Sequence, residues 1–492
     1  MKKIIIFLIA AMSFSLATKA QTDVWDGTAV AWAQGDGTQA NPYLIQSAEN
    51  LAYLANLVNN GTSVAGDYYR LMVDIDLNGS QTFQWTPIGN ATHSFSGNFD
   101  GNNHTISNLF INTSSLQYVG LFGRISISTI ENLGIAGQSN ITNTNNNILQ
   151  NPCSGGIVGR CDSTVTIMNC YNKGNIASTA FYTGGIAGQC SSTVKIMNCY
   201  NTGHISSYAS CSGGIVGQCS AKATIIDCYN KGPISDYSPS SGGIVGECYS
   251  ADTITITNCY NSANITFLSS YSGGIVGHCY STAKMTITSC YNTGDVYSAP
   301  SPSFSGGIAG LCNANVTIMN SYNIGNIYGC YRAGIAHGTG IITNSYYLDT
   351  SNTHVNYLSS SEMQTQSFVD MLNQGLATSV WRMDYTNHIN NGFPILIWQS
   401  GTNGICGVNK ENFLALKLYP NPANSRTNLY VNGLKNNADI IIYDINGREV
   451  KRLKINKSEK DIDIDLNGLA KGIYQVRVID NSISTTKKLI VR

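Results

Sequence analysis

The residues of this sequence that could act as general acids, bases or nucleophiles are few and scattered. In the repeats after Cys153 the acidic ones are Asp162, Asp227, Asp236, Glu247, Asp252 and Asp295. Glycoside hydrolysis needs two carboxylates about 5–9.5 Å apart, and no two of these occupy matching positions one repeat apart. His204, His278 and His337 also stand at unmatched positions, where a surface location is expected. Without a Gly-x-Ser-x-Gly elbow or a phosphate loop, the sequence predicts a protein that is not an enzyme.

Two segments begin like a calcium-binding loop. Asp74-x-Asp76-x-Asn78-Gly79 has Trp85 at its twelfth position, where the loop needs a bidentate Glu. Asp463-x-Asp465-x-Asn467-Gly468 has Tyr474 at the same place. Both segments also alternate as strands do. The sequence therefore predicts no metal site and no cofactor.

Most of the cysteines fall into two columns of the repeat. One column is Cys161, Cys190, Cys219, Cys248, Cys279 and Cys312, and the other is Cys170, Cys199, Cys228, Cys259 and Cys290. Stacked coils about 4.8 Å apart lie within reach of a disulfide, and an exported protein meets an oxidising compartment. Parallel neighbours point the same way, however, which favours a ladder of buried small hydrophobes. Zinc is disfavoured because short Cys-x-x-Cys spacing is absent.

Aromatic side chains are the candidate ligand contacts. One tyrosine recurs in each repeat, which gives the row Tyr171, Tyr200, Tyr229, Tyr260, Tyr291 and Tyr322. On the outside of a solenoid this row would form a flat platform for sugar rings, and the alternative is that it covers a coil corner. The Asn after each Tyr is expected to share amide hydrogen bonds along the stack. Variable loops carry a second set of candidates: Phe181, Tyr182, Tyr208, Tyr237, Phe267, Tyr271, Tyr297 and Phe304.

These residues belong to one repeated sequence, which begins at Gly155-Gly156-Ile157 and ends at Asn169-Cys170-Tyr171-Asn172. Counted on the second glycine, the steps between full copies are 29, 29, 29, 31 and 33 residues. A fixed period of this size is typical of a solenoid. Val165 and Ile167 alternate with polar residues, so one face is buried, while position 160 varies between copies and is expected to point out. Glycines such as Gly174 recur at a corner where a positive φ is expected.

Composition and the first residues predict export. Formal net charge is zero, which gives no electrostatic case for nucleic acid. Charged residues make up 11% of the chain, against about 25% in an average protein. Residues 1–20 have a basic start, a short apolar core and a small residue before a cleavage site, as in a secretory signal peptide.

The fold class predicted is all-β: a right-handed β-helix-like solenoid with small helical caps, followed by a C-terminal β-sandwich. Residues 21–110 form an N-terminal capping module, with a helix behind Ser47, and residues 111–349 form the solenoid. Residues 350–400 close it with a second helix and an apolar strand at 393–398. Residues 401–414 are a linker, and 415–492 are a separate domain of short strands with an Asn-Gly hairpin turn.

Two resemblances follow from these motifs. The repeats, with "VGLFG" and "GGIVG…NCYNxG", resemble the GLUG-motif repeats of bacterial surface proteins, for most of which no activity is implied. Such repeats also occur beside IgA-cleaving metallopeptidase domains, but the His-Glu-x-x-His motif is absent here. The last segment, with "YPNP", "YDINGREV" and "LNGLAKGIYQVRV", resembles the type A C-terminal sorting domain of type IX secretion cargo. The residues that carry this likeness are Tyr419, Pro420, Asn421, Pro422, Tyr443, Asp444, Asn446, Gly447, Gly472, Tyr474 and Lys488.

The second resemblance implies a route and partners. They are the inner-membrane secretion machinery, the outer-membrane translocon with its sorting peptidase, and surface lipopolysaccharide if the product stays attached. The expected location is the extracellular space or the outer-membrane surface, reached through the periplasm. The function expected is a non-catalytic surface protein, an adhesin or a glycan- or protein-binding scaffold. A polysaccharide-active β-helix enzyme and a structural surface-coat protein are the alternatives.

Overall fold

The structure is a computed structural model. It describes residues 25–492 apart from 209, 238, 251, 268–269, 281–283, 299–301, 314, 349–355, 386–388, 401–414, 433, 435, 445–447 and 481–482. The expected signal peptide, the linker, and Asn446 and Gly447 lie outside the described residues, as do the side chains of Phe267 and Asp236.

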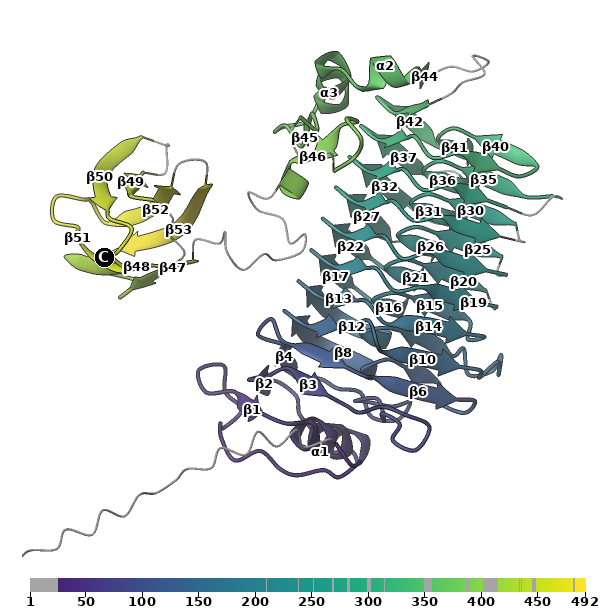
Figure 1. The fold of residues 1–492 in the computed structure, drawn as a ribbon, viewed down its shortest axis with the longest axis horizontal. Coiled ribbons are helices and arrows are strands. Elements are labelled where there is room, and N and C mark those ends of the chain that lie inside the picture. Colours follow the sequence, from purple (N-terminus) through teal and green to yellow (C-terminus); the bar gives the residue numbers. More distant parts are fainter. Residues whose placement is uncertain are drawn as a thin grey trace, which may run out of the picture.

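Four parallel sheets, which we call A to D, run along the solenoid (Figure 1). Each coil contributes one short strand to sheets B, C and D, and most coils contribute two to sheet A. One coil is β11 (Cys153–Gly155), β12 (Val158–Met168), β13 (Tyr171–Asn172) and β14 (Asn175–Ser178). Each strand pairs in register with its equivalent in the next coil, so that Cys161 faces Cys190 and Tyr171 faces Tyr200. This confirms the predicted all-β solenoid.

The remaining solenoid strands repeat this order. Sheet A, which contains β12, also holds β1 (Tyr43–Ile45), β2 (Tyr68–Leu71), β4 (Asn98–Asp100), β8 (Phe122–Glu131), β16 (Ala187–Cys190), β17 (Val194–Met197), β21 (Val216–Cys219), β22 (Ala223–Ile226), β26 (Val245–Cys248), β27 (Thr253–Thr257), β31 (Val276–Cys279), β32 (Lys284–Thr288), β36 (Ala309–Cys312), β37 (Val316–Met319), β41 (Ala336–Gly338) and β42 (Ile341–Thr343). Sheet B, which contains β13, also holds β3 (Ile75–Asp76), β5 (Thr105–Ser107), β9 (Gly134–Ile135), β18 (Tyr200–Asn201), β23 (Tyr229–Asn230), β28 (Tyr260–Asn261), β33 (Tyr291–Asn292), β38 (Tyr322–Asn323), β43 (Tyr346–Leu348) and β44 (Tyr357–Leu358).

The other two sheets are narrower. Sheet C, which contains β14, also holds β6 (Phe110–Thr113), β10 (Asn140–Asn143), β19 (Ile205–Ser207), β24 (Ile234–Asp236), β29 (Ile265–Phe267), β34 (Val296–Tyr297) and β39 (Ile327–Tyr328). Sheet D, which contains β11, also holds β7 (Tyr118–Val119), β15 (Tyr182–Gly184), β20 (Cys211–Gly213), β25 (Ser240–Gly242), β30 (Tyr271–Gly273), β35 (Phe304–Gly306) and β40 (Tyr331–Ala333).

The core of the solenoid is the predicted apolar face. Val165 and Ile167 are almost wholly buried, as are Cys161 and Cys170 in the two cysteine columns. β-Branched residues suit such strands because their side chains pack well on a pleated, buried surface. The 13 buried cysteines among the described residues form no disulfide, and neither does the exposed Cys330. The columns therefore pack as small hydrophobes, which is the interpretation that the sequence favoured over disulfides.

The recurrent glycines are required for a different reason from the one predicted. Gly174 and Gly203 do not have a positive φ. A Cβ added to Gly203 would overlap the carbonyl of Gly174 in the coil below, so the close stacking of backbones excludes a side chain there. Positive φ falls instead on the residue before each second-column cysteine, such as Asn169 and Asp227, both at φ 54°. Asn and Asp tolerate this left-handed conformation better than most residues.

Both ends of the solenoid carry helices (Figure 1). At the N-terminal end, Ser47 is the N-cap of α1 (Ala48–Asn59), and its side chain accepts a hydrogen bond from Asn50 N. At the C-terminal end, α2 (Ser360–Met363) and α3 (Gln366–Asn373) replace the single helix expected. After β45 (Trp381–Arg382), the predicted apolar strand is only β46 (Ile395–Leu396) and then becomes a 3₁₀ turn, η1 (Ile397–Ser400). Among the described residues, no helix is long and apolar enough to span a bilayer.

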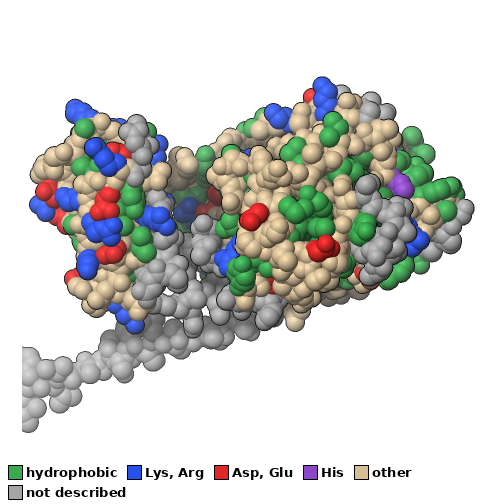
Figure 2. Space-filling view, turned by 90° about the horizontal axis from the view of Figure 1, so that it is seen from above, with side chains coloured by type: hydrophobic (Ala, Val, Ile, Leu, Met, Phe, Trp, Pro, Cys, Tyr) green, Lys and Arg blue, Asp and Glu red, His purple; other side chains and the backbone are tan. Residues whose placement is uncertain are grey.

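The C-terminal domain is the expected sandwich of two antiparallel sheets. One contains β47 (Ala415–Tyr419), β48 (Arg426–Asn432) and β51 (Asp461–Asp465), and the other β50 (Glu449–Ile455), β49 (Ala438–Tyr443), β52 (Gly472–Asp480) and β53 (Ile483–Val491). Both sheets bury side chains in one core. On the face shown in Figure 2, Lys, Arg, Asp and Glu crowd the surface of this domain, on the left, whereas the side chains of the solenoid are mostly uncharged.

Candidate ligand-binding surface

The tyrosine row is a continuous stack of rings. From Tyr171 to Tyr322 neighbouring rings lie 4.8–5.2 Å apart and within 9° of parallel. The in-register strands of sheet B impose this spacing, because each tyrosine sits directly above its equivalent. The geometry of the predicted row is therefore as expected.

The row is not an open platform, however, and this expectation needs correction. Tyr200 is 7% exposed and Tyr322 is 0% exposed, and only Tyr171 is half-buried. Residues of the C-terminal cap cover the rings, including Phe368, Trp381 and Trp398. The cap follows the solenoid in the chain but folds back along sheet B, so its own apolar side chains take the place expected for a ligand.

Polar contacts hold this cover in place. Gln399 donates from Nε2 to the Tyr291 hydroxyl at 2.6 Å. Trp398 donates from Nε1 to the carbonyl of Asn258 at 3.2 Å, and Tyr322 donates to the carbonyl of Pro394. Burial raises the pKa of Tyr322. The row thus anchors the cap and fits the alternative that it covers a corner.

The asparagine row beside it is also formed as predicted. Asn201, Asn230 and Asn261 are completely buried. The Nδ2 of Asn201 donates to Asn230 Oδ1 and that of Asn230 to Asn261 Oδ1, both at 2.9 Å. This ladder pairs each buried amide and fixes the register of the coils.

The variable position of the Gly-Gly-Ile strand points away from the core, as predicted, but it is buried all the same. Gln189, Gln218 and Glu247 are each 7% exposed. Side chains from the start of the sheet D strands pack over them, as Cys211 does with Sγ 2.9 Å from Glu247 Oε2. Gln218 donates to the same carboxylate oxygen at 2.8 Å.

His278 extends this column and is not the surface residue that the sequence predicted. It is 5% exposed, and neither ring nitrogen has a hydrogen-bond partner in the part of the chain that the structure describes. Tyr271 and Tyr280 lie on either side of it, each with ring centroids 4.2 Å away. Burial lowers the pKa of His278, and the nearby Glu247 opposes that shift. The other two histidines that the sequence analysis placed at the surface are His204, which is exposed, and His337, which is half-buried.

Around His278 lies a chain of rings that we call the aromatic patch: Tyr249, Tyr271, His278, Tyr280, Phe304, Tyr331 and His337. The two ends of this chain are accessible, with Tyr249 54% and Tyr331 49% exposed. The sequence singled out Tyr271 and Phe304 but missed Tyr249 and Tyr280. Tyr249 and Tyr280 each follow a first-column cysteine, at the start of a segment that is two residues longer than the same segment in the first full copy. Such insertions in solenoids mark surface loops, and this could have identified the two tyrosines from the sequence.

Outside the aromatic patch, two further pairs of tyrosine rings stack at the surface of the solenoid. Tyr208 and Tyr237 lie 4.8 Å apart and are 59% and 53% exposed. Tyr297 and Tyr328 lie 4.3 Å apart. Tyr182 and Phe181 contact each other edge to face, and burial raises the pKa of Tyr182 to about 12. Aromatic side chains are thus accessible along the outside of the coils, where tyrosine favours ligand or protein contacts.

Among the acidic side chains of the repeats, Asp162 is held by local partners. Asp162 accepts hydrogen bonds from Arg160, Arg124 and Ser191. Burial tends to raise its pKa, but these bonds outweigh burial and leave the pKa below its usual value. Asp227 differs, because its Oδ1 is buried with no hydrogen-bond partner among the described residues and burial raises the pKa of this carboxyl.

The other carboxylates described are either hydrogen-bonded to neighbouring residues or exposed to solvent. Asp295 accepts from the backbone and side chain of Asn326, and Asp252 is exposed. In the rejected calcium segment, Asp74 accepts from Thr105 N and Asp76 from Asn78 N. Within the described residues no group of three His, Cys, Asp or Glu side chains is arranged to hold a metal ion.

In the C-terminal domain, the "YPNP" segment is tied to the last strand. Asn421 donates from Nδ2 to the carbonyl of Lys488 at 2.7 Å and accepts from Ile490 N at 2.9 Å. The Tyr419 hydroxyl donates to Asp461, and Thr427 donates to the carbonyl of Pro420. Tyr419 to Pro422 are exposed. The structure thus brings both ends of the domain together at its surface.

Other residues of the sorting resemblance lie along the larger sheet. Tyr443 in β49 pairs with Gln475 in β52, next to Tyr474, whose hydroxyl donates to Ala470 O at 2.8 Å. Asp444 accepts at Oδ2 from Arg448 Nε, 3.1 Å away. Gly472 begins β52.

Fold and surface together define a class: a β-solenoid that carries a separate antiparallel sandwich at its C-terminus. Residues 417–492 match the family model described as a secretion system C-terminal sorting domain. A domain of this kind, the sorting tail of type IX secretion, directs its chain to the cell surface or the extracellular space through the type IX machinery. The chain is therefore an exported or cell-surface protein.

Part of the chain is similar in sequence to parts of much longer proteins. It is 34% identical over 152 residues to Halomucin of Haloquadratum walsbyi and 34% identical over 137 residues to the "Putative Gly-rich membrane protein" of Evansella cellulosilytica. Each alignment covers 27% of this chain but only 2% and 14% of those two proteins. In structure, the chain is similar to the "putative immunoglobulin A1 protease" of Bacteroides ovatus, with a TM-score of 0.45 and 19% identity over 75% of this chain and 95% of that one.

Proposed function

We propose that this protein is a non-catalytic binding protein of the cell surface or extracellular space, an adhesin or scaffold whose solenoid binds glycans or proteins. The repeats are proposed to be of the GLUG type. Export is proposed to begin with removal of residues 1–20 and to pass through the periplasm. Attachment to surface lipopolysaccharide is the proposed fate if the mature chain is retained.

The observation that carries this proposal is the aromatic patch. Seven linked rings present two accessible tyrosines, Tyr249 and Tyr331, at their ends. Buried partners such as His278 hold the rings, so little side-chain freedom is lost when a ligand binds. Tyrosine combines an apolar face with a hydroxyl, which suits both sugar rings and protein surfaces.

The non-catalytic part of the proposal rests on the acidic residues. Glu247 is covered by Cys211 and Gln218, and Asp162 is bonded to two arginines. A glycosidase needs one protonated and one ionised carboxyl facing the same bond, and these side chains already have other partners.

The test uses the full secreted chain with immobilised cellulose, chitin, xylan and mucin as probes. Retention on each material and release of soluble fragments are measured in the same samples. Replacing Tyr249 and Tyr331 with Ser should reduce retention at least tenfold, while Tyr385→Ser, at an exposed tyrosine of the cap, should leave it unchanged. Release of fragments that is lost in Glu247→Gln would favour the enzyme. A chain that neither binds nor cleaves any probe would favour a structural coat.

A further inference from the structure

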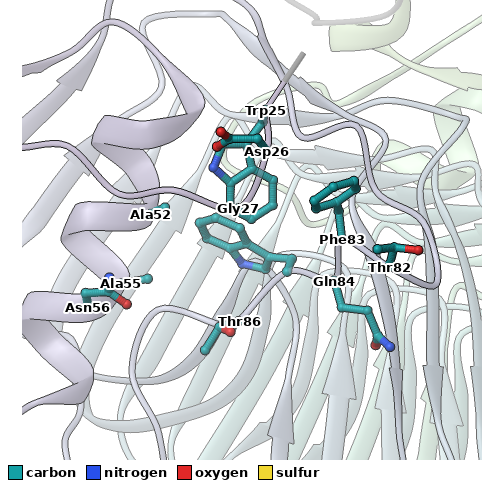
Figure 3. A pocket seen from close by; sticks show the side chains of 11 residues that line it. Trp25, Asp26, Gly27, Ala52, Ala55, Asn56, Thr82, Phe83, Gln84 and Thr86 are labelled. Atoms are coloured by element: carbon teal, nitrogen blue, oxygen red, sulfur yellow. The ribbon is translucent and has the colours of Figure 1, made fainter. Parts of the chain in front are cut away.

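A cleft lies at the N-terminal end of the solenoid, against α1. It is a cleft of about 280 Å³ between the helix and the segment that leads into the first coils. Figure 3 shows Trp25 near its centre, Phe83 to one side and α1, with Ala52 and Ala55, to the other. It is lined by Trp25, Asp26, Gly27, Ala52, Ala55, Asn56, Thr82, Phe83, Gln84, Trp85 and Thr86.

The cleft exists because α1 presents short side chains to large rings. Ala52 and Ala55 face the cleft from the helix. The two indoles are 5.8 Å apart at 57°, and both are almost wholly buried. Trp85 donates from Nε1 to Leu121 O at 3.0 Å, and Trp25 from Nε1 to Thr28 O at 2.9 Å. Their polar atoms are therefore paired within the protein, so the indoles form a fixed floor beneath the cleft and expose only 4% and 3% of their surface.

The rim of the cleft is polar. Asp26 accepts from Thr28 N at Oδ1, 2.9 Å away, and hydrogen bonds from Thr28 lower its pKa, so the carboxylate is ionised at neutral pH. Gln84 accepts from Asn112 N at Oε1, 2.8 Å away, so its amide group is engaged with the strand beside the cleft. Asn56 and Thr86 are exposed on the rim. The lining contains no Lys or Arg, so it would repel an anion rather than bind it.

We propose that this cleft binds a single neutral sugar residue. The apolar C–H face of the sugar would lie against the half-buried ring of Phe83, and its hydroxyls would bond to the exposed side chains of Asp26 and Asn56. The volume is near the lower end of the range for small-molecule sites, about 300–1,000 Å³, as one sugar ring requires. This site is separate from the aromatic patch and does not depend on it.

The experiment is calorimetric titration of the full secreted chain with the methyl glycosides of glucose, galactose, mannose and N-acetylglucosamine. Methylamine and glucuronate are the cationic and anionic comparison probes. At least one neutral glycoside should bind saturably with a Kd on the order of 1 mM, as expected for a small polar ligand. Phe83→Ala removes one wall, and Thr86→Trp fills the cleft from its exposed rim. Each should weaken binding at least tenfold, and Thr86→Trp covers the case in which Phe83→Ala fails to fold.

The matched control is the chain with Tyr249 and Tyr331 replaced by Ser, which should bind the glycosides as the wild type does. The sugar site is overturned if no neutral glycoside binds, if methylamine binds in their place, or if both cleft variants bind normally. Loss of glycoside binding in the control would also overturn it, by placing the sugar on the aromatic patch. Failure of polymer retention with glycoside binding intact would instead overturn only the role of the patch.

Discussion

The asparagine ladder offers the sharpest test of how the coils are held in register. Asn230 donates from Nδ2 to Gly232 O and to Asn261 Oδ1, both at 2.9 Å, and accepts from Asn201 Nδ2 and Gly232 N. Replacing it with Asp keeps the shape and the two accepted bonds. At neutral pH, however, an ionised carboxylate has no proton to donate, and it would face two buried acceptors.

The size of the effect follows from those two acceptors. Leaving a buried acceptor unpaired costs about 1–3 kcal/mol, so Asn230→Asp should lower the free energy of unfolding by about 2–6 kcal/mol at pH 7. The folded-state pKa of the new carboxyl should lie above its unfolded value of about 3.9, because the site is buried and faces acceptors. The loss should therefore be complete above the folded-state pKa and shrink as the pH falls toward 4.

The assay is denaturant unfolding of the full chain, followed by far-ultraviolet circular dichroism at pH 7 and pH 4. Asn175→Asp is the matched control, because Asn175 is exposed and uses its side-chain oxygen as an acceptor for His204 N. It should change the free energy by less than about 0.5 kcal/mol. If Asn230→Asp is no less stable than Asn175→Asp at pH 7, or loses as much at pH 4 as at pH 7, the ladder does not act as described.

Three other predictions concern the thiols, the buried histidine and export. Alkylation of the native chain followed by peptide mapping should modify Cys330 and leave the 13 buried cysteines unmodified until the chain is unfolded; a peptide pair linked through Cys279 and Cys312 would contradict this. Because burial lowers the pKa of His278, the unfolded chain binds its proton more tightly, and melting temperature should fall as the pH drops below about 6.5. His278→Leu, which copies the residue at this position in the next coil, should reduce that dependence, and an unchanged slope would count against it. Deleting residues 415–492 should retain the chain inside cells in a fractionation and protease-protection assay, and normal surface levels would argue that the sorting domain is dispensable.

The sequence predicts a structural feature well when neighbouring residues or the repeat period determine that feature. The period of 29 residues and the columns of cysteine, tyrosine and asparagine followed directly from the spacing, since parallel strands of equal length stack in register. The sequence also predicted Ser47 as the cap of the first helix and a C-terminal sandwich, and the structure has both. The glycine corner was located correctly, but its cause was misjudged, because Gly174 and Gly203 are excluded from bearing side chains by a neighbouring coil and not by their own φ.

What only the tertiary structure decided is which columns reach solvent. Tyr291 and Tyr322 have the sequence pattern of an open platform, yet Gln399 and Pro394 bond to their hydroxyls from more than 70 residues away in the chain. Burial of an outward-facing side chain depends on what a distant segment packs against it, and periodicity carries no information on that. The sequence by itself determined the stacked coils and their register, whereas packing between distant segments determined that the tyrosine row is covered and that the aromatic patch around Tyr249 and Tyr331 is accessible.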